Sequence, residues 1–432
     1  MMKKTISMVL GLLMILSLAA CGAKKPEEIT EDGFSPSLDT TISGQIKIAG
    51  SYDNFEALEA EFDIFNEYYP NVELQYTKVD DYNNMIGTVL KGNDAPDIYV
   101  NYSWMYGREK YQTSIDQAED LSDPALGLDL DCIRKNILLH TDDASLPMVP
   151  IFSNTYGMLV NNTLFEKEGL SVPTTYQEMV AVCNEFRKKG YENPMMGFSN
   201  KETTSLFTVS IFPFFYETLA HDPEAVKKLN TLDASAGEYM RPTLEKISQF
   251  LKDGCVNLDA CANIENNYEA VILRFFEGDI PMMFCSGDTV SGTKKRESRS
   301  EAFIANPFTY TFVPVPMTDE GLLFLDMSNL QFSVNKDSSN LDMANEFLRF
   351  LVTPQELNNI AQNKGLMAPT KDLSFNSMYA AFGAVPEERI LSPEVIGLTD
   401  DASTQLRLAV YSVGTGEMTI DDAIAAYGTF TQ

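Results

Sequence analysis

The chain has 432 residues and a formal net charge of −30, because 62 acidic side chains outnumber 32 basic ones. Such an acidic chain has no basic stripe to displace counterions from phosphates, which argues against a nucleic acid as partner. The length exceeds what one hydrophobic core usually serves, so two lobes are expected.

Residues 1–21 have the pattern of an export signal. Two lysines precede an apolar run over residues 8–16, which is too short to span a bilayer, and small residues follow it. Residues 18–21, L-A-A-C, resemble the bacterial lipobox, whose cleavage leaves Cys21 at the new N-terminus with lipid attached. Because one acyl chain binds a membrane only weakly, stable anchoring needs several acyl chains on Cys21. The alternative is an ordinary secreted protein with a chance cysteine. Cleavage removes two positive charges and no negative one, so the net charge of −30 becomes −32.

Residues 22–44 are polar, rich in Gly, Pro and Ser, and without apolar periodicity, which predicts a flexible tether. The folded body is expected to begin near Gln45. Beyond Cys21 there are five cysteines, none at C-x-x-C spacing, which is typical of neither a disulfide framework nor a zinc site. Cys255 and Cys261 either pair or, like the other three, remain buried thiols.

Strand and helix patterns alternate at the start of this body. Strands are predicted over 45–50, 72–79 and 95–100, and amphipathic helices over 54–69 and 82–90. The alternation predicts a parallel sheet with crossover helices, in which ligands bind beyond the carboxyl ends of the strands. At those ends the sequence places Tyr52, Asp53, Asn101, Tyr102 and the single tryptophan, Trp104.

Residues 146–178 predict a crossing between two lobes. Pro147 and Pro150 favour extended backbone before them. The strand that follows, over 151–160, begins and ends apolar but has a polar and aromatic window in its middle. A strand that leaves one core and enters another has such a window, which we expect to face a cleft. Its side chains include Ser153, Asn154 and Tyr156.

The second lobe is less clearly patterned. A helix over 176–189 and a short strand over 195–199 lead to a polar loop that contains Asn200. An apolar core helix over 206–219 is expected to be kinked or broken near its proline. A buried strand over 282–284 then opens into Gly287 and Asp288, where glycine permits close backbone approach and the carboxylate offers acceptors.

Several motifs in this order resemble one known family. They are Y-P-N-V-E-L over 69–74, A-P-D-I over 95–98, the crossing segment over 147–178, and F-E-G-D-I-P-M-M over 276–283. Together they resemble the bacterial extracellular solute-binding lipoproteins, namely the sugar-type, maltodextrin-binding-protein-like receptors of ABC importers. The chain departs from the pattern at Tyr176, where the family has Trp, and at Pro281, where it has Ala.

The resemblance implies an α/β, two-lobed periplasmic-binding-protein-like fold. Each lobe would be a mainly parallel sheet flanked by helices, with three interlobe crossings. Lobe one would comprise 45–153 and 317–368, and lobe two 154–316 and 369–432. It also implies a monomeric receptor on the extracytoplasmic face of the cell membrane, anchored through the lipid on Cys21, that hands a sugar or oligosaccharide to permease subunits.

The polar and aromatic side chains suit such a ligand, because sugars present apolar faces and a rim of hydroxyls. The lobes would close around it about hinge residues. Because only one tryptophan is present, a receptor for a peptide, polyamine or similar solute is the alternative. The predicted ligand-binding residues are Tyr52, Asp53, Asn101, Tyr102, Trp104, Ser153, Asn154, Tyr156, Asn200, Gly287 and Asp288.

Enzymatic chemistry has little support in the sequence. Only two histidines occur, and no nucleophile elbow, zinc-protease or phosphate-loop motif is present. Acid pairs such as 80–81 and 142–143 are typical of caps and loops, although a surface glycoside hydrolase, which needs two carboxylates, is a third hypothesis. Metal capture by Tyr68 and Tyr69 is less expected than packing. We therefore expect no catalytic residue, metal or cofactor.

Overall fold

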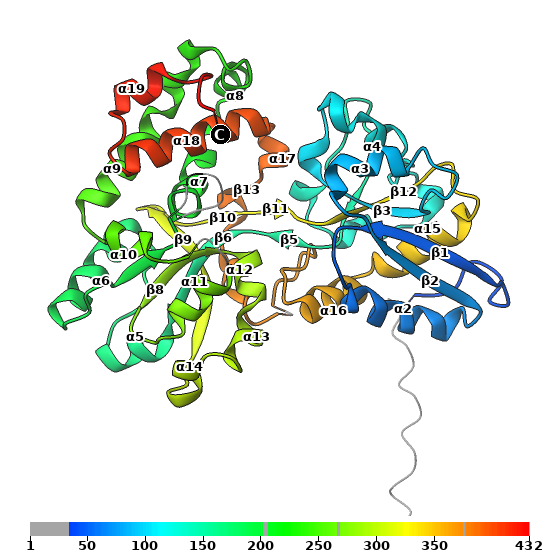
Figure 1. The fold of residues 1–432 in the computed structure, drawn as a ribbon, viewed down its shortest axis with the longest axis horizontal. Helices are drawn as coiled ribbons and strands as arrows, with labels where there is room; N and C mark the ends of the chain where they lie inside the picture. The colour runs from blue at the N-terminus through cyan, green and yellow to red at the C-terminus, as the bar shows by residue number, and fades with distance from the viewer. Residues whose placement is uncertain (1–33, 200, 202–205, 266–267, 375, 432) are drawn as a thin grey trace, which may run out of the picture. The chain divides into compact units, whose positions relative to one another are not determined.

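The computed structural model describes residues 34–199, 201, 206–265, 268–374 and 376–431. The predicted export signal, Cys21 and the first part of the tether lie outside these residues, as does Asn200. Residues 34–37 have no regular secondary structure. Residues 38–432 form a separate unit by their internal contacts, and this unit contains both lobes (Figure 1).

The first lobe is built on a five-stranded sheet of order β2-β1-β3-β12-β4. β1 pairs in parallel with β2 and β3, whereas β12 runs antiparallel to β3 and β4. The predicted alternation of strand and helix is confirmed, with boundaries shifted by a few residues. The strands are β1 (Gly44–Gly50), β2 (Val72–Lys78), β3 (Ile98–Asn101), β4 (Val149–Pro150) and β12 (Gln331–Val334).

Amphipathic helices cover this sheet. α2 buries Phe62 and Phe65 against Phe347 of α15, with ring centroids 5.3 and 5.1 Å apart. The three- and four-residue spacing of apolar side chains on α2 accounts for this buried face. The helices of the lobe are α2 (Glu56–Tyr68), α3 (Tyr82–Val89), α4 (Gln112–Asp116), α15 (Leu341–Leu351) and α16 (Pro354–Lys364). Its single turns are η1 (Ser103–Met105), η2 (Glu109–Tyr111), η3 (Pro124–Leu126), η4 (Leu130–Cys132) and η5 (Lys135–Ile137).

The second lobe is built on a six-stranded sheet of order β13-β10-β9-β6-β8-β7. Only the two outer pairs, β13 with β10 and β8 with β7, are parallel. This sheet is therefore mixed rather than mainly parallel, because β6 lies between two strands, β8 and β9, that run opposite to it. The strands are β6 (Tyr156–Asn161), β7 (Met195–Gly197), β8 (Met282–Ser286), β9 (Tyr310–Thr318), β10 (Gly321–Leu325) and β13 (Ile390–Leu391).

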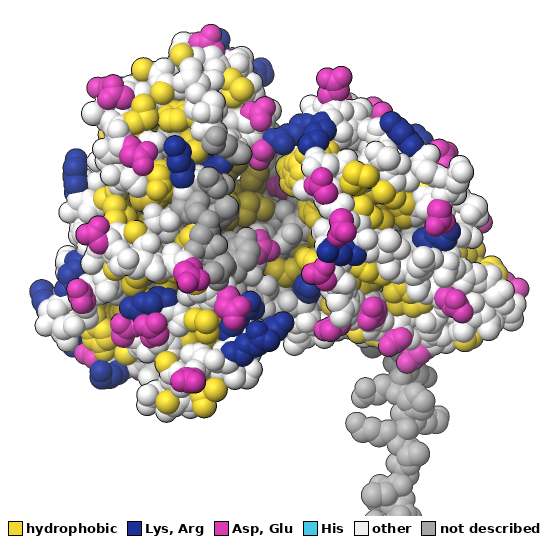
Figure 2. Space-filling model, in the orientation of Figure 1, with side chains coloured by type: hydrophobic (Ala, Val, Ile, Leu, Met, Phe, Trp, Pro, Cys, Tyr) yellow, Lys and Arg dark blue, Asp and Glu magenta, His cyan; other side chains and the backbone are white. Residues whose placement is uncertain are grey.

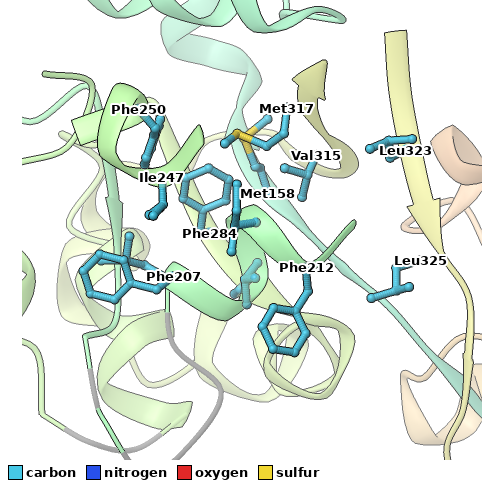
Figure 3. Packing of buried hydrophobic residues seen from close by; sticks show 14 of the residues in the cluster. Met158, Phe207, Phe212, Ile247, Phe250, Phe284, Val315, Met317, Leu323 and Leu325 are labelled. Carbon is cyan, nitrogen blue, oxygen red and sulfur yellow. The ribbon is translucent and has the colours of Figure 1, made fainter. Parts of the chain in front are cut away.

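α7 (Leu206–Leu219) lies at the centre of the second core. Figure 3 shows Phe207 and Phe212 of this helix near Met158 of β6 and Phe284 of β8. α7 continues through Pro213, where a kink or break was predicted. Among the described residues, no helix is both long enough and apolar enough to cross a membrane.

Further helices surround this core. They are α5 (Asn162–Glu168), α6 (Tyr176–Lys188), α8 (Pro223–Asn230), α9 (Arg241–Lys252), α10 (Leu258–Ala262), α11 (Tyr268–Phe275), α12 (Gly287–Ser291), α13 (Thr293–Glu297), α14 (Glu301–Ala305), α17 (Pro393–Ile396), α18 (Asp400–Gly414) and α19 (Ile420–Ala425). The 3₁₀-helices are η6 (Ala234–Met240), η7 (Ala380–Ala384) and η8 (Glu387–Arg389). The five cysteines within the described part of the chain are free thiols, so Cys255 and Cys261 are not bonded to each other.

Three crossings join the lobes, as expected. β5 (Ser153–Asn154) in the first pairs antiparallel with β11 (Met327–Ser328) in the second. The third follows α16 and is attached to the first by a bridge between Ser153 and Met367. The predicted boundary at 316/317 differs from the structure, because residues 310–325 form β9 and β10 of the second sheet and the chain returns only at 326–329.

A candidate ligand-binding cleft between the lobes

A cavity of about 930 Å³ lies between the two lobes. Figure 2 shows the hollow between them, with hydrophobic side chains at its margin. A cavity of this size suits a small molecule or short oligomer. The first lobe contributes Ser103, Trp104, Tyr106, Arg108 and His140. The second crossing contributes Met327 and Ser328, and β6 of the second lobe contributes Tyr156. The second lobe contributes Thr208, Phe212, Tyr216, Asn230, Glu394, Asp400 and Arg407.

Aromatic rings line both sides of this cavity. On the first lobe, Trp104 stacks on Tyr102 with ring centroids 5.7 Å apart and an interplanar angle of 20°. Tyr111 meets the edge of Trp104 at 5.1 Å, which fixes the indole. On the other side, the Tyr156 ring packs 6.4 Å from that of Phe212 on α7. The structure therefore brings the predicted Trp104 and Tyr156 into one cavity.

A carboxylate of the second lobe meets two crossings. Asp288, in the first turn of α12, accepts hydrogen bonds from Asn154 Nδ2 at 2.6 Å and from Asn329 Nδ2 at 2.8 Å. A Cβ on Gly287 would lie 2.6 Å from Asn154 Oδ1, so a larger residue here would displace the Asn154 amide. Burial raises the pKa of Asp288, and the two amide hydrogen bonds oppose that shift. The predicted Asn154, Gly287 and Asp288 therefore form one group.

Two predicted tyrosines of the first lobe lie near this group. Tyr102 Oη is 3.4 Å from Ser51 Oγ, and Lys364 Nζ lies 4.0 Å from the centre of the Tyr52 ring. Burial raises the pKa of Tyr52, and the neighbouring Tyr102 and Asp288 raise it further. Tyr52 and Tyr102 thus occupy the part of the first lobe that is close to Asp288.

Three other predicted residues are engaged elsewhere. The Asp53 side chain is 87% exposed and pairs with Lys78 Nζ at 2.5 Å. Asn101 is fully buried and donates to Ser333 Oγ and to a main-chain carbonyl, both at 3.2 Å. Ser153 is also fully buried and accepts from Arg134 Nη2 at 2.7 Å. Their assignment as ligand contacts stays a prediction, and these contacts favour supporting roles for Asn101 and Ser153.

Glu394 of α17 was not predicted, yet it lines the cavity. Its carboxylate accepts from the Ser328 main-chain N–H at 3.0 Å, Ser103 Oγ at 3.1 Å and Ser392 Oγ at 2.8 Å, and also from Ser328 Oγ. Burial raises its pKa, and these hydrogen bonds oppose the shift. The sequence S-P-E predicts a helix start, but nothing local indicates that this turn faces the first lobe.

An ion pair closes one side of the cavity. Arg108 of the first lobe pairs with Asp400 at the start of α18, and Asp401 Oδ1 lies 3.6 Å from the same Nη2. The Arg108 and Asp400 side chains are 30% and 50% exposed. Acidic side chains are favourable at a helix N-terminus, which is one reason why Asp400 and Asp401 occur there.

These groups offer hydrogen-bond acceptors to a ligand. Asp288 and Glu394 hold acceptor oxygens against amide and hydroxyl donors, the kind of donor that a sugar hydroxyl can replace. Within the described residues, no group of three or more His, Cys, Asp or Glu side chains is placed to hold a metal ion. Tyr69 is buried and donates to Glu346 Oε1 at 2.5 Å, which supports the packing interpretation of this tyrosine.

Comparison with known proteins gives consistent matches. The family model of the bacterial extracellular solute-binding protein matches residues 60–386. The melibiose/raffinose/stachyose-binding protein MelE of Bacillus subtilis (strain 168) is 20% identical over 385 residues, which cover 88% of this chain and 84% of that protein. Apo RafE of Streptococcus pneumoniae has a TM-score of 0.68 at 16% identity and covers 91% of this chain and 99% of its own. The sugar-binding protein MalE of Xanthomonas citri has a TM-score of 0.67 at 16% identity, with 89% and 95% covered.

Proposed function

This chain belongs to the bacterial extracellular solute-binding protein family, and we propose that it captures a sugar or oligosaccharide between its lobes and delivers it to an ABC importer. The observation that carries the proposal is the cavity of about 930 Å³ with aromatic rings on both sides and the Glu394 carboxylate bonded to serine donors. A second carboxylate, Asp288, lies outside the lining of this cavity, where the second lobe meets two crossings, and is bonded to two amides. The sugars in the name of the Bacillus subtilis relative support the same ligand class.

The chemistry of the cavity fits the two surfaces of a sugar. Trp104 and Tyr156 offer rings for the apolar faces of pyranose units. Asp288 and Glu394 offer oxygens to hydroxyls, and their present amide and serine partners show that neutral donors satisfy them. A ligand with many hydroxyls can donate hydrogen bonds to these acceptor oxygens without bringing a further charge out of water.

Glu394, Asp400 and Asp401 also support the alternative of a cationic solute such as a polyamine. Arg108 and Arg407 line the same cavity, however, and Arg108 already neutralises part of the acidic rim. A polyamine receptor would leave these guanidinium groups facing a like charge, which opposes binding. We therefore rank the sugar above the cation.

The remaining steps are those expected of a member of the family. Closure of the lobes about the three crossings would enclose the sugar, and permease subunits would bind the closed, monomeric form. Lipid on Cys21 would anchor the receptor to the extracytoplasmic face of the cell membrane. The receptor would release its ligand unchanged, without catalysis.

A thermal-shift screen of residues 22–432 tests the ligand class. The panel contains melibiose, raffinose, stachyose, maltooligosaccharides, short peptides and spermidine. A ligand present at about 100 times its Kd adds about 2.7 kcal/mol to the free energy of unfolding, so a cognate oligosaccharide should raise Tm clearly. A shift with spermidine or a peptide alone would reject the sugar. Chromatography of the bound oligosaccharide should recover it intact, and hydrolysis products would reject a receptor without catalysis.

Fractionation of cells tests the anchor separately. The wild-type chain should sediment with the membrane, and Cys21→Ser should appear in the medium or the soluble fraction. Equal membrane association of both chains would contradict the anchor and leave the ligand proposal intact.

A further inference from the structure

Arg134 is a buried cation outside the cavity, next to all three crossings. It directly precedes η5 in the first lobe, and its side chain is 7% exposed. Its partner Asp326 lies at the start of the second crossing and is fully buried. Neither side chain lines the cavity.

The five N–H groups of this guanidinium are all used. Nε and Nη2 donate to the two carboxylate oxygens of Asp326 at 2.7 and 2.8 Å, in the second crossing. Nη2 also donates to Ser153 Oγ at 2.7 Å, in the first crossing. Nη1 donates to the carbonyl oxygens of Ala368 at 2.9 Å and Thr370 at 2.5 Å, in the third. One side chain therefore bonds to all three crossings.

Main-chain contacts hold this side chain in place. The Arg134 N–H donates to Pro369 O at 3.0 Å, and Lys371 N–H donates to Cys132 O at 3.0 Å. Asp326 is held from both lobes, because its carboxylate also accepts from Asn136 Nδ2 at 2.8 Å while its N–H donates to Leu391 O of β13 at 2.7 Å. The group thus spans the junction between the lobes.

The ion pair between Arg349 and Glu346 differs from that of Arg134 in where its two residues lie. Arg349 makes a similar bidentate pair with Glu346, with Nε–Oε2 and Nη2–Oε1 both 2.9 Å, but both residues belong to the single helix α15. The acceptors of Arg134 lie instead on the three crossings, whose backbone dihedral angles change when the two lobes move. Their shared donor makes independent movement of these segments costly.

We infer that Arg134 is the positioning residue of the interlobe movement, which holds the three crossings together so that they turn as one hinge. The inference rests on the proposed function, because capture by closure gives the hinge its purpose. Arg134 acts through the crossings and does not touch the ligand. Its loss should therefore loosen the coupling between the lobes while the groups that line the cavity stay in place.

Hydrogen exchange of the ligand-free mature chain tests this inference directly. The crossings are linked by main-chain hydrogen bonds from Ser153 N–H to Met367 O and from Asn329 N–H to Phe152 O, both 2.9 Å. In Arg134→Lys, which keeps the charge but loses the planar fork, exchange in peptides over 151–154, 326–329 and 366–370 should rise by about tenfold or more. Peptides from β1 and β8 should keep their wild-type exchange.

Arg349→Lys is the matched control and should raise exchange around α15 and the end of α2, where Tyr69 donates to Glu346, but not at the crossings. Wild-type exchange at all three crossings in Arg134→Lys, a rise at only one of them, or an equal rise in both lobe cores would overturn the inference. If Arg134→Lys does not fold, Asp326→Asn removes the charge at the same size and should give the same three-segment pattern. Since no sugar is present, failure of the sugar proposal in the thermal-shift screen leaves this result interpretable.

A ligand-dependent measurement then connects the hinge to capture. Small-angle scattering should show a decrease in radius of gyration when the wild type binds its oligosaccharide. Arg134→Lys should show a smaller decrease at saturating ligand, and Arg349→Lys the wild-type decrease. The same full decrease in all three chains would contradict a positioning role for Arg134.

Discussion

In the described part of the chain, two arginine–aspartate pairs connect the lobes, and they differ in burial and in the number of their partners. Arg134 and Asp326 are buried at the crossings, and the guanidinium makes five hydrogen bonds to oxygen atoms. Arg108 and Asp400 lie at the edge of the cavity and are partly exposed. A buried pair is costly to break because one charge is left without a partner, whereas an exposed pair contributes little and is screened by salt. The Arg134–Asp326 pair therefore holds the crossings together, whereas the Arg108–Asp400 pair is a weak contact that can open and close.

Breaking the buried pair should have the largest effect. Arg134→Met leaves the Asp326 carboxylate buried without a cation, which should lower the free energy of unfolding by about 3–5 kcal/mol in urea denaturation. The double variant Arg134→Met/Asp326→Leu should recover much of this loss, since no charge remains. If the double variant is no more stable than the single one, the cost does not come from an uncompensated charge.

Glu61 is a buried carboxyl group that, unlike Asp326, has no arginine partner among the described residues. Glu61 of α2 is fully buried, and its carboxyl oxygens have no hydrogen-bond donor among the described residues. Burial and the adjoining Glu356 carboxyl raise the pKa of Glu61 to about 9. The folded chain therefore binds this proton more tightly than the unfolded chain, whose glutamate has a pKa near 4.5. The resulting stability is complete below about pH 4.5 and is lost as the pH rises toward 9.

Urea denaturation between pH 6 and pH 8 measures this loss. The free energy of unfolding should fall with rising pH by up to about 1.4 kcal/mol per pH unit from this group. Glu61→Gln should flatten that slope, and Glu59→Gln on the exposed side of the same helix is the control. Identical slopes in the wild type and Glu61→Gln would show that Glu61 is not protonated in the folded chain.

Trp104 in the cavity should contribute to affinity rather than to the hinge. Trp104→Ala removes the ring that stacks on Tyr102 and should weaken oligosaccharide binding about tenfold in calorimetry, as expected for the loss of about 1.4 kcal/mol of ring contact. Tyr191→Phe changes an aromatic residue of the second lobe that does not line the cavity, and it should bind the oligosaccharide with wild-type affinity. Wild-type affinity in Trp104→Ala would place the ligand away from this ring.

Breaking the exposed pair should have the smallest effect. Arg108→Ala should change the free energy of unfolding by less than about 1 kcal/mol. Any loss of ligand affinity should be measurable at about 20 mM NaCl and should disappear at about 500 mM, because salt screens exposed charges. A loss of affinity that is equally large at both salt concentrations would mean that Arg108 contacts the ligand itself.

The elements from β1 to β3 in the first lobe could be predicted from the sequence. Apolar residues alternate along the strands and recur every three or four residues along the helices, and this pattern depends only on residues close in the chain. The family resemblance put the boundary of the second crossing at 316/317, but Pro314 and Pro316 lie within β9. Prolines inside a central strand are unusual, so the pattern was misleading. The crossing at Ser153 and Asn154 was correctly predicted, because its polar side chains interrupt an otherwise apolar strand.

The candidate site was predictable only where it lies within a predicted strand or directly follows one. Trp104, Asn154, Tyr156 and Asp288 each lie just after or within a predicted strand, and the structure brings them to the space between the lobes. Glu394 was missed because its position depends on the third crossing, which carries α17 against Ser103 of the first lobe. Arg134 was missed for the same reason, since its five acceptors are distributed over three distant segments.

Titration of Trp104 fluorescence in the wild type and in Glu394→Gln tests the central claim most directly, because Trp104 is the only tryptophan in the chain. We predict that raffinose or a related neutral oligosaccharide changes the emission of the wild type saturably. Glu394→Gln, which keeps the shape but weakens the acceptor, should need about tenfold more ligand for the same change. No change with any oligosaccharide, together with a saturable change with a cationic solute, would contradict sugar capture in this cavity.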